Sequence, residues 1–282
     1  MKVGLFIVGA PKSGTTSLYH YLKEHPEIYM SKEKELDFFS HEELGELITY
    51  YKSNPITSHK DYLLQFEGVT NEKILGEGSV SYLFYPETPC KISKYNPNAK
   101  IIIMLRNPIY RAFSHYLMDY KLGLVNIPFE QVLNQKHKIY YQQFIEIGFY
   151  YQQVKRYLDV FGQENVHIIK YGDFKNHTFN EVRKVFDFLN INSTYSPNVI
   201  IHNKFMMPKQ SWVRKFYSLV WARRMLSFLL PNKVIETLKD FLFKQGKPKL
   251  SDDLKNELLQ LYNEDIGLLE GLLNMDLRRW KK

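Results

Sequence analysis

The stretch GLFIVGAPKSGTTSLYHYL, residues 4–22, constrains the fold of this chain more than any other stretch. A short apolar run meets a turn that contains glycine and proline, and an amphipathic segment follows it as far as Pro26. This order is typical of a buried strand, a phosphate-binding loop and a helix, because backbone N–H groups at a helix N-terminus form an anion site. The sequence therefore predicts a strand at 3–8 with an anion site at its carboxyl end.

The loop departs from the usual nucleotide-binding pattern. Gly9 and Gly14 fit the spacing G-x-x-x-x-G-K-[ST], but Thr15 follows the second glycine and the lysine stands earlier, at Lys12. In nucleoside triphosphatases the lysine after the second glycine reaches the phosphates, and a carboxylate helps to hold magnesium. Here a later apolar run, KIIIML, ends in Arg106 instead of an aspartate. These residues indicate a nucleotide that needs no metal and carries an additional phosphate.

The order of strand, turn and helix recurs along the chain, at 99–120 and at 165–189, and a shorter strand is expected at 73–77. Strands that alternate with helices require crossover connections, which produce a parallel sheet with helices on both faces. We therefore predict an α/β fold, a P-loop-type parallel sheet flanked by helices. Ligands of such sheets bind at the carboxyl ends of the strands.

Beyond residue 210 the pattern is helical only, and it includes a helix at 251–273 with Ser251 as N-cap. We predict one domain over 1–282, in which 210–282 form a helical C-terminal part. The segment WVRKFYSLVWARRMLSFLLP, 212–231, is the most apolar, but four arginine and lysine residues interrupt it. A basic helix packed on the body is the preferred interpretation, and a helix in contact with a membrane surface is the alternative.

Charge and cysteine usage narrow the environment and the partners. The formal net charge is +8, which favours an anionic partner without choosing among a nucleotide, an acidic glycan, nucleic acid and a membrane surface. Cys90 is the single cysteine, so no intrachain disulfide can form and a reducing compartment fits. With no targeting segment recognised at the N-terminus, we expect a cytoplasmic protein.

Two segments carry a family resemblance. PKSGTTSL and IIIMLRNPIYRAFSHY resemble the two phosphosulfate-binding elements of sulfotransferases, which use 3′-phosphoadenosine-5′-phosphosulfate (PAPS) and release adenosine 3′,5′-bisphosphate. The resemblance implies that Arg106 and Ser114 hold the 3′-phosphate. It implies that the 5′-phosphosulfate is held by the loop residues Lys12, Ser13, Gly14, Thr15 and Thr16, with Lys12 also stabilising the leaving phosphate and no metal involved.

A third segment, SKEKELDFFS at 31–40, resembles the acidic-aromatic segment of heparan-type and bacterial carbohydrate sulfotransferases. In those enzymes a glutamate before the aromatic pair is the general base, and the matching residue is Glu35. Glu33 is the rival carboxylate, two residues away. The resemblance implies an acceptor hydroxyl, on a carbohydrate, and no nucleic-acid partner.

A fourth segment, GEGSVSYLF at 76–84, departs from the family. Heparan-type enzymes carry a lysine in a Glu-Lys-[Ser/Thr]-x-x-Tyr setting, and this chain has Gly78 in its place. Either Lys12 stabilises the leaving phosphate alone, or a lysine from elsewhere assists it. Glu77 is expected to orient a neighbour or to contact the acceptor, and Tyr82 to pack in the core.

HNKFMMPK, 202–209, resembles a loop in which a basic residue closes over the nucleotide; Lys204 is preferred over Lys209. Two other functions stay open on the residues alone, a small-molecule P-loop kinase and a non-enzymatic protein that binds anions or membranes. A histidine base, as in cytosolic sulfotransferases, is also considered, with His20, His25, His41 and His115 as candidates.

Overall fold

The structure, a computed structural model, describes residues 2–46, 54–135, 138–198, 206–210, 213, 234, 237 and 241–281. Lys204 lies outside the described residues, and so does 212–231 apart from Val213. The prediction of a basic helix at 212–231 therefore stays a prediction.

Five parallel strands form the central sheet, in the order β2-β3-β1-β4-β5. They are β1 (Leu5–Gly9), β2 (Ile28–Met30), β3 (Ile74–Gly78), β4 (Lys100–Leu105) and β5 (Val166–Lys170). The predicted parallel α/β sheet is confirmed, and each strand expected from the sequence is present. The edge strand β2 is an addition, since its three residues are too short for a periodic pattern.

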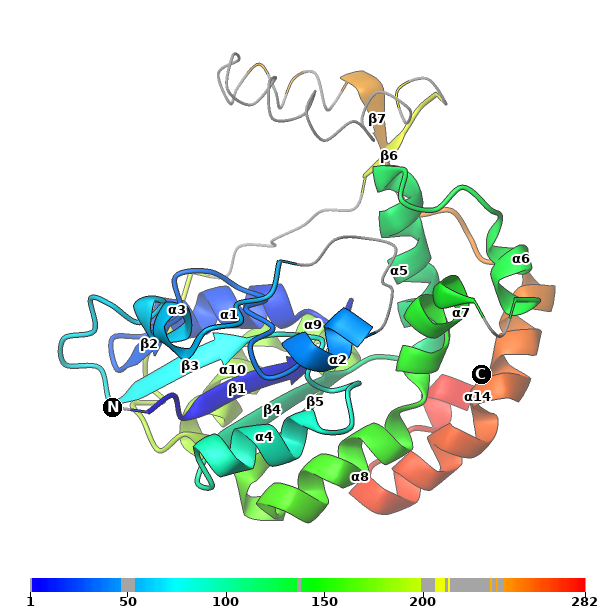
Figure 1. Cartoon of the computed structure of the whole chain (residues 1–282). Coiled ribbons are helices and arrows are strands. Elements are labelled where there is room, and N and C mark those ends of the chain that lie inside the picture. The colour runs from blue at the N-terminus through cyan, green and yellow to red at the C-terminus, as the bar shows by residue number, and fades with distance from the viewer. Residues whose placement is uncertain are drawn as a thin grey trace.

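Helices connect the strands and cover the sheet (Figure 1). They are α1 (Thr15–Lys23), α2 (His41–Glu46), α3 (His59–Leu64), α4 (Thr88–Tyr95), α5 (Pro108–Leu122), α6 (Phe129–Leu133), α7 (Ile139–Phe144), α8 (Tyr150–Phe161), α9 (Tyr171–Asn176), α10 (Thr178–Phe188) and α14 (Asp252–Leu273). Short 3-10 helices lie at Glu146–Gly148, Gln163–Asn165 and Arg278–Lys281. The third predicted unit differs in detail, because α9 follows β5 directly where a turn was expected.

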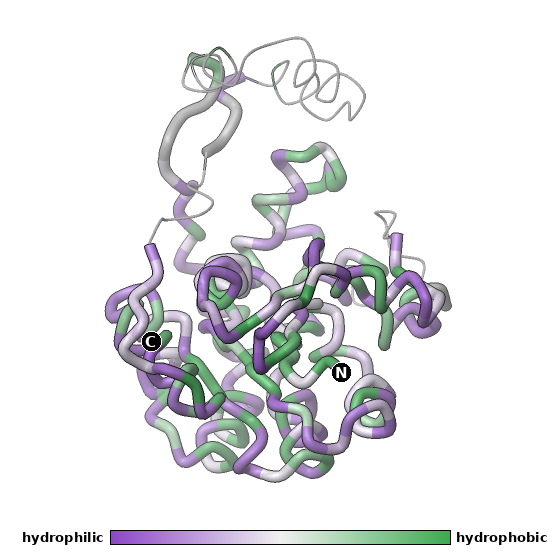
Figure 2. Tube along the Cα trace, turned by 90° about the vertical axis from the view of Figure 1, so that its left-hand side faces the viewer, coloured by the Kyte–Doolittle hydropathy of each residue, from purple (hydrophilic) through white to green (hydrophobic). Residues whose placement is uncertain are grey.

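Alternate residues of the strands enter two separate cores. Leu5 and Ile7 of β1 pack with α1, α9 and α10 on one face of the sheet. Phe6 and Val8 pack on the other face, in a larger core to which α4, α5, α8 and α14 contribute. Both faces of the sheet are therefore buried, which accounts for the continuous apolar runs of the strands. The covering helices are amphipathic, and hydrophobic and hydrophilic stretches alternate along them in Figure 2.

The described C-terminal residues are not helical throughout, so that part of the prediction is wrong. Strand β7 (Phe243–Gln245) pairs antiparallel with β6 (Met206–Pro208), and the two lie apart from the main sheet, beyond the end of α5 (Figure 1). The helix expected at 251–273 is confirmed as α14, whose first turn is capped by the Ser251 hydroxyl accepting from the Leu254 N–H. Among the helices that the structure describes, none is long and apolar enough to span a membrane.

Candidate active site

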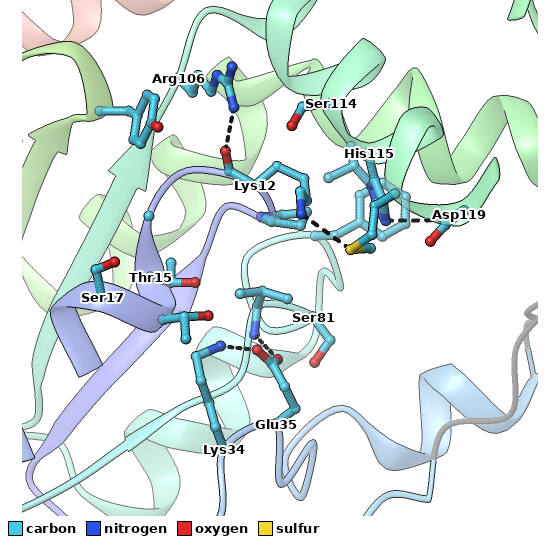
Figure 3. A pocket seen from close by; sticks show the side chains of 18 of the residues that line it. Lys12, Thr15, Ser17, Lys34, Glu35, Ser81, Arg106, Ser114, His115 and Asp119 are labelled. Carbon is cyan, nitrogen blue, oxygen red and sulfur yellow. Dashed lines mark hydrogen bonds and ion pairs between the residues drawn. The ribbon is translucent and has the colours of Figure 1, made fainter. Parts of the chain in front are cut away.

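A cavity of about 850 Å³ opens at the carboxyl ends of β1, β3 and β4. Its walls come from the loop after β1, the segment after β2 and helix α5 (Figure 3). The chain after β7 also lines it, through Lys247. This volume falls within the range of about 300–1,000 Å³ that ligand sites occupy. Strand ends of a parallel sheet thus converge on one cavity, as the sequence predicts.

The loop after β1 has the geometry of an anion site. Gly14 is the N-cap of α1 and has a φ of +94°, which favours glycine, and Lys12 has a φ of +65°. The first residues of α1, Thr15 and Thr16, line the cavity, so the helix N-terminus with its unpaired N–H groups lies beside it. The Ser13 hydroxyl is fully buried and has no hydrogen-bond partner among the described residues. An anion in this loop fits both observations.

Lys12 extends from this loop toward α5. Its Nζ lies 3.2 Å from the Met118 sulfur (Figure 3), a weak acceptor. Burial lowers the pKa of Lys12, and the nearby carboxylate of Asp119 opposes that shift. Burial in turn raises the pKa of Asp119 to about 7. Lys12 thus presents a partly desolvated cation in the cavity, where electrostatic interactions with an anion are strong.

Arg106, directly after β4, is bound to the same loop. Its Nη1 donates to the Lys12 carbonyl oxygen at 3.0 Å, and its guanidinium lies 4.8 Å from the centre of the Tyr171 ring. These contacts orient the guanidinium beside the cavity that Ser114 of α5 also lines. Arg106 and Ser114, the two residues predicted to hold the 3′-phosphate, therefore line the same cavity as the loop after β1.

Lys247 is a site residue that sequence reasoning missed. It follows β7, and its Nζ donates to the Ser114 hydroxyl at 3.1 Å. Residue 247 as a whole is exposed, but its ammonium is partly withdrawn from water, and the positive charges of Arg106 and Lys12 lie near it. Desolvation first, and these charges second, lower the pKa of Lys247 to about 8. The prediction for Lys204, which lies outside the described residues, stays a prediction. Lys209 instead donates to the Phe241 carbonyl oxygen, away from the cavity.

Glu35 enters the cavity from the side opposite Lys12 (Figure 3). One carboxylate oxygen accepts from the Val80 N–H at 2.8 Å and the other pairs with the Lys34 ammonium (Figure 3). The backbone at Glu35 is left-handed, with φ +63°, a conformation that costs a non-glycine residue energy. Glu33, the rival base, is exposed and does not line the cavity. Both glutamates lie in the loop after β2.

Asp37 is a second carboxylate of the cavity, also missed from the sequence. It is buried, burial raises its pKa, and its Oδ1 accepts from the Ser81 hydroxyl at 2.5 Å. Behind it, Glu77 is fully buried and accepts from the hydroxyls of Tyr62, Tyr82 and Ser79. Burial raises the pKa of Glu77 to about 7. Glu77 therefore orients neighbouring hydroxyls and does not line the cavity, and Tyr82 packs in the core as predicted.

His115 alone among the four candidate histidines lines the cavity. Its ring is buried, lies 3.1 Å from the Gln143 amide nitrogen, and burial holds its pKa well below the usual value. The others, His20, His25 and His41, lie outside it. Among the described residues no group of three or more His, Cys, Asp or Glu side chains is placed to hold a metal ion.

Comparison with known proteins identifies the class. The sulfotransferase domain family matches residues 3–225, and the chain belongs to this family. A crystal structure of a sulfotransferase from Alicyclobacillus acidocaldarius superposes with a TM-score of 0.77, with 30% identity and all of both chains covered. Family and fold together define the class as that of the sulfotransferases, and the loop after β1, Arg106 and Ser114 line one cavity.

Two curated relatives are more distant or shorter matches. The membrane-associated sulfotransferase kil1 of Dictyostelium discoideum is 34% identical over 110 residues, 39% of this chain and 21% of that protein. The carbohydrate sulfotransferase 15 of Mus musculus is 25% identical over 248 residues, 66% of this chain and 43% of that protein. The chain thus spans less than half the length of these curated relatives.

Proposed function

We propose that this chain transfers a sulfuryl group from PAPS to a carbohydrate hydroxyl, with Glu35 as general base. One observation carries the proposal: the Glu35 carboxylate lines the same cavity as Lys12, Arg106 and Ser114. In the proposed step the acceptor oxygen attacks sulfur while its proton passes to Glu35. The bond from sulfur to the 5′-phosphate oxygen breaks, and its electron pair stays on the phosphate.

The remaining residues bind and stabilise charge. Lys12 and the loop N–H groups offset the charge that grows on the 5′-phosphate, and such preorganised groups supply the largest part of catalysis in comparable sites. Arg106, Ser114 and Lys247 fix the donor through its 3′-phosphate. The Val80 N–H holds the Glu35 carboxylate in position.

A carbohydrate acceptor is supported by two observations. The mouse relative is named a carbohydrate sulfotransferase. Phe84 and Tyr85 line the cavity beside Ser81, so that an aromatic surface adjoins a hydroxyl group there. Such a combination suits a sugar ring, which has an apolar face and a polar edge. The cytoplasmic location and the extent of one domain over 1–282 stay predictions.

Glu35→Gln tests the base, because glutamine keeps the shape of the side chain but takes up no proton. We expect sulfation of oligosaccharide acceptors from radiolabelled PAPS to slow by about 10²–10⁴. Binding of adenosine 3′,5′-bisphosphate, measured by calorimetry, should stay the same.

Glu33→Gln is the matched control, since Glu33 is exposed and outside the cavity, and it should leave the rate unchanged. Asp37→Asn is the competing variant, since Asp37 is the other carboxylate of this wall. Loss of activity in Asp37→Asn together with full activity in Glu35→Gln would transfer the role of base to Asp37.

A further inference from the structure

Gly78, the last residue of β3, lies beside the end of the Lys34 side chain. A Cβ added at Gly78 would lie 3.7 Å from the Cε of Lys34 and 3.3 Å from a ring carbon of Tyr19. The Glu35 N–H donates to the Gly78 carbonyl oxygen at 2.9 Å, which fixes the segment after β2 beside the end of β3. The end of the Lys34 side chain thus lies within van der Waals contact of the place where a side chain at 78 would begin.

The Lys34 ammonium is a largely, but not fully, buried cation of the cavity. Only 15% of its side chain is exposed, and it pairs with Glu35. It lines the same cavity as Thr15 and Thr16 of the phosphate loop, and Figure 3 shows Lys34 on the side opposite Lys12. Burial lowers its pKa to about 8, so the charged form still predominates at neutral pH.

We propose that Lys34 is the second catalytic cation of the sulfuryl transfer, supplied from the loop after β2 to the place where Gly78 provides no side chain. The inference rests on the proposed function. As sulfur passes from the phosphate oxygen to the acceptor oxygen, the Lys34 ammonium balances charge on the sulfuryl and bridging oxygens from the side opposite Lys12. Lys34 keeps its proton throughout, and the hydroxyl proton goes to Glu35.

The ion pair between Lys34 and Glu35 also affects the general base. Sulfuryl oxygens that enter the cavity compete with Glu35 for the Lys34 ammonium. When Lys34 turns to them, the Glu35 oxygen that it occupied becomes available to the acceptor hydroxyl, while the Val80 N–H still holds the other oxygen. Donor binding thereby frees the base.

Neutralisation of Lys34 is the primary test. Lys34→Met keeps a long unbranched side chain, and we expect the transfer rate to fall by about a hundredfold, as on removal of one preorganised charge-stabilising group. The affinity for adenosine 3′,5′-bisphosphate should change less than threefold. Lys32→Met is the matched control, because Lys32 is exposed and pairs with Glu67 at the surface; its rate should be that of the wild type.

Moving the positive charge of Lys34 to another position tests whether the residue acts through its charge or through its packing. The double variant Lys34→Ala with Gly78→Lys places an ammonium on the neighbouring strand end, and it should recover at least tenfold over Lys34→Ala alone. Since a Cβ at 78 meets Tyr19 closely, Lys34→Arg serves as the second charge-retaining variant, and it should exceed Lys34→Met at least tenfold. Equal rates for Lys34→Arg, Lys34→Met and the wild type would overturn the inference.

Hydrolysis of PAPS without an acceptor distinguishes this inference from the proposed function. Water then attacks sulfur, and adenosine 3′,5′-bisphosphate, sulfate and a proton are released. A wild type that hydrolyses PAPS but sulfates no carbohydrate contradicts the proposed acceptor, and slower hydrolysis by Lys34→Met would still support the inference. Hydrolysis and sulfation at wild-type rates in Lys34→Met would instead contradict Lys34 and leave the transferase proposal intact.

Discussion

At the scale of a single residue, we expect Lys247 to make donor binding depend on pH. Its ammonium contacts Ser114, and its pKa is lowered to about 8 by partial desolvation and by the neighbouring cations. A phosphate binds the protonated form, so binding is strongest below pH 8 and weakens as the pH rises through that value. We expect the affinity for adenosine 3′,5′-bisphosphate to fall between pH 7 and pH 9, by about tenfold if one proton is lost.

Calorimetry at the two pH values measures this effect. Lys247→Arg keeps its charge at pH 9 and should lose less affinity than the wild type. Lys249→Ala is the matched control, since Lys249 is exposed and does not line the cavity. The prediction fails if Lys247→Ala has the same pH dependence as the wild type.

The sequence identified some residues of the site and missed others. Lys12 and Arg106 follow strand ends, which meet in a parallel sheet. The role of Ser114, within α5, was implied by the resemblance to sulfotransferases. Lys247 could not be located from the sequence, because its contact with Ser114 joins positions 133 residues apart. Asp37 was visible as a carboxylate, but a loop has no periodicity from which its direction could be read.

At the scale of elements, the length of each strand or helix determined whether the sequence could predict it. The units built on β1, β4 and β5 each combine an apolar run with an amphipathic helix, and the pattern identifies them. The strands β2, β6 and β7 have three residues each. Three residues give no alternation to recognise, and their pairing is set by tertiary contacts.

The prediction at this scale concerns the contact between helices α14 and α8. Asp265 of α14 accepts from the backbone N–H groups of Tyr150 and Tyr151, at 2.7 and 3.2 Å, and thereby caps the first turn of α8. Asp265→Ala should lower the free energy of unfolding by about 1–2 kcal/mol, since unbonded helix N–H groups remain. Urea unfolding measures it. Glu264→Ala, an exposed neighbour on α14, should change the midpoint little, and equal shifts in both variants would exclude a capping role.

At the scale of the whole molecule, the location of charge matters more than its sum. The formal net charge is +8, and Lys12, Arg106, Lys247 and Lys175 lie together at the cavity. The carboxylates Glu35, Asp37 and Asp119 also line the cavity, but the cations outnumber them. An excess of positive charge in a cleft raises the association rate of an anion, an effect that salt screens. Association of adenosine 3′,5′-bisphosphate, followed by stopped flow, should therefore slow steeply as the ionic strength rises.

Two charge reversals separate the local field from the net charge. Lys175→Glu at the cavity and Lys60→Glu on exposed α3, away from it, lower the net charge equally. Lys175→Glu should reduce the association rate at low salt by about threefold to tenfold, and Lys60→Glu should have little effect, because focusing acts where the charges line the cleft. The difference should vanish near 0.5 M salt, where the screening length is about 4 Å. Equal reductions in the two variants would mean that net charge, and not its concentration at the cavity, attracts the donor.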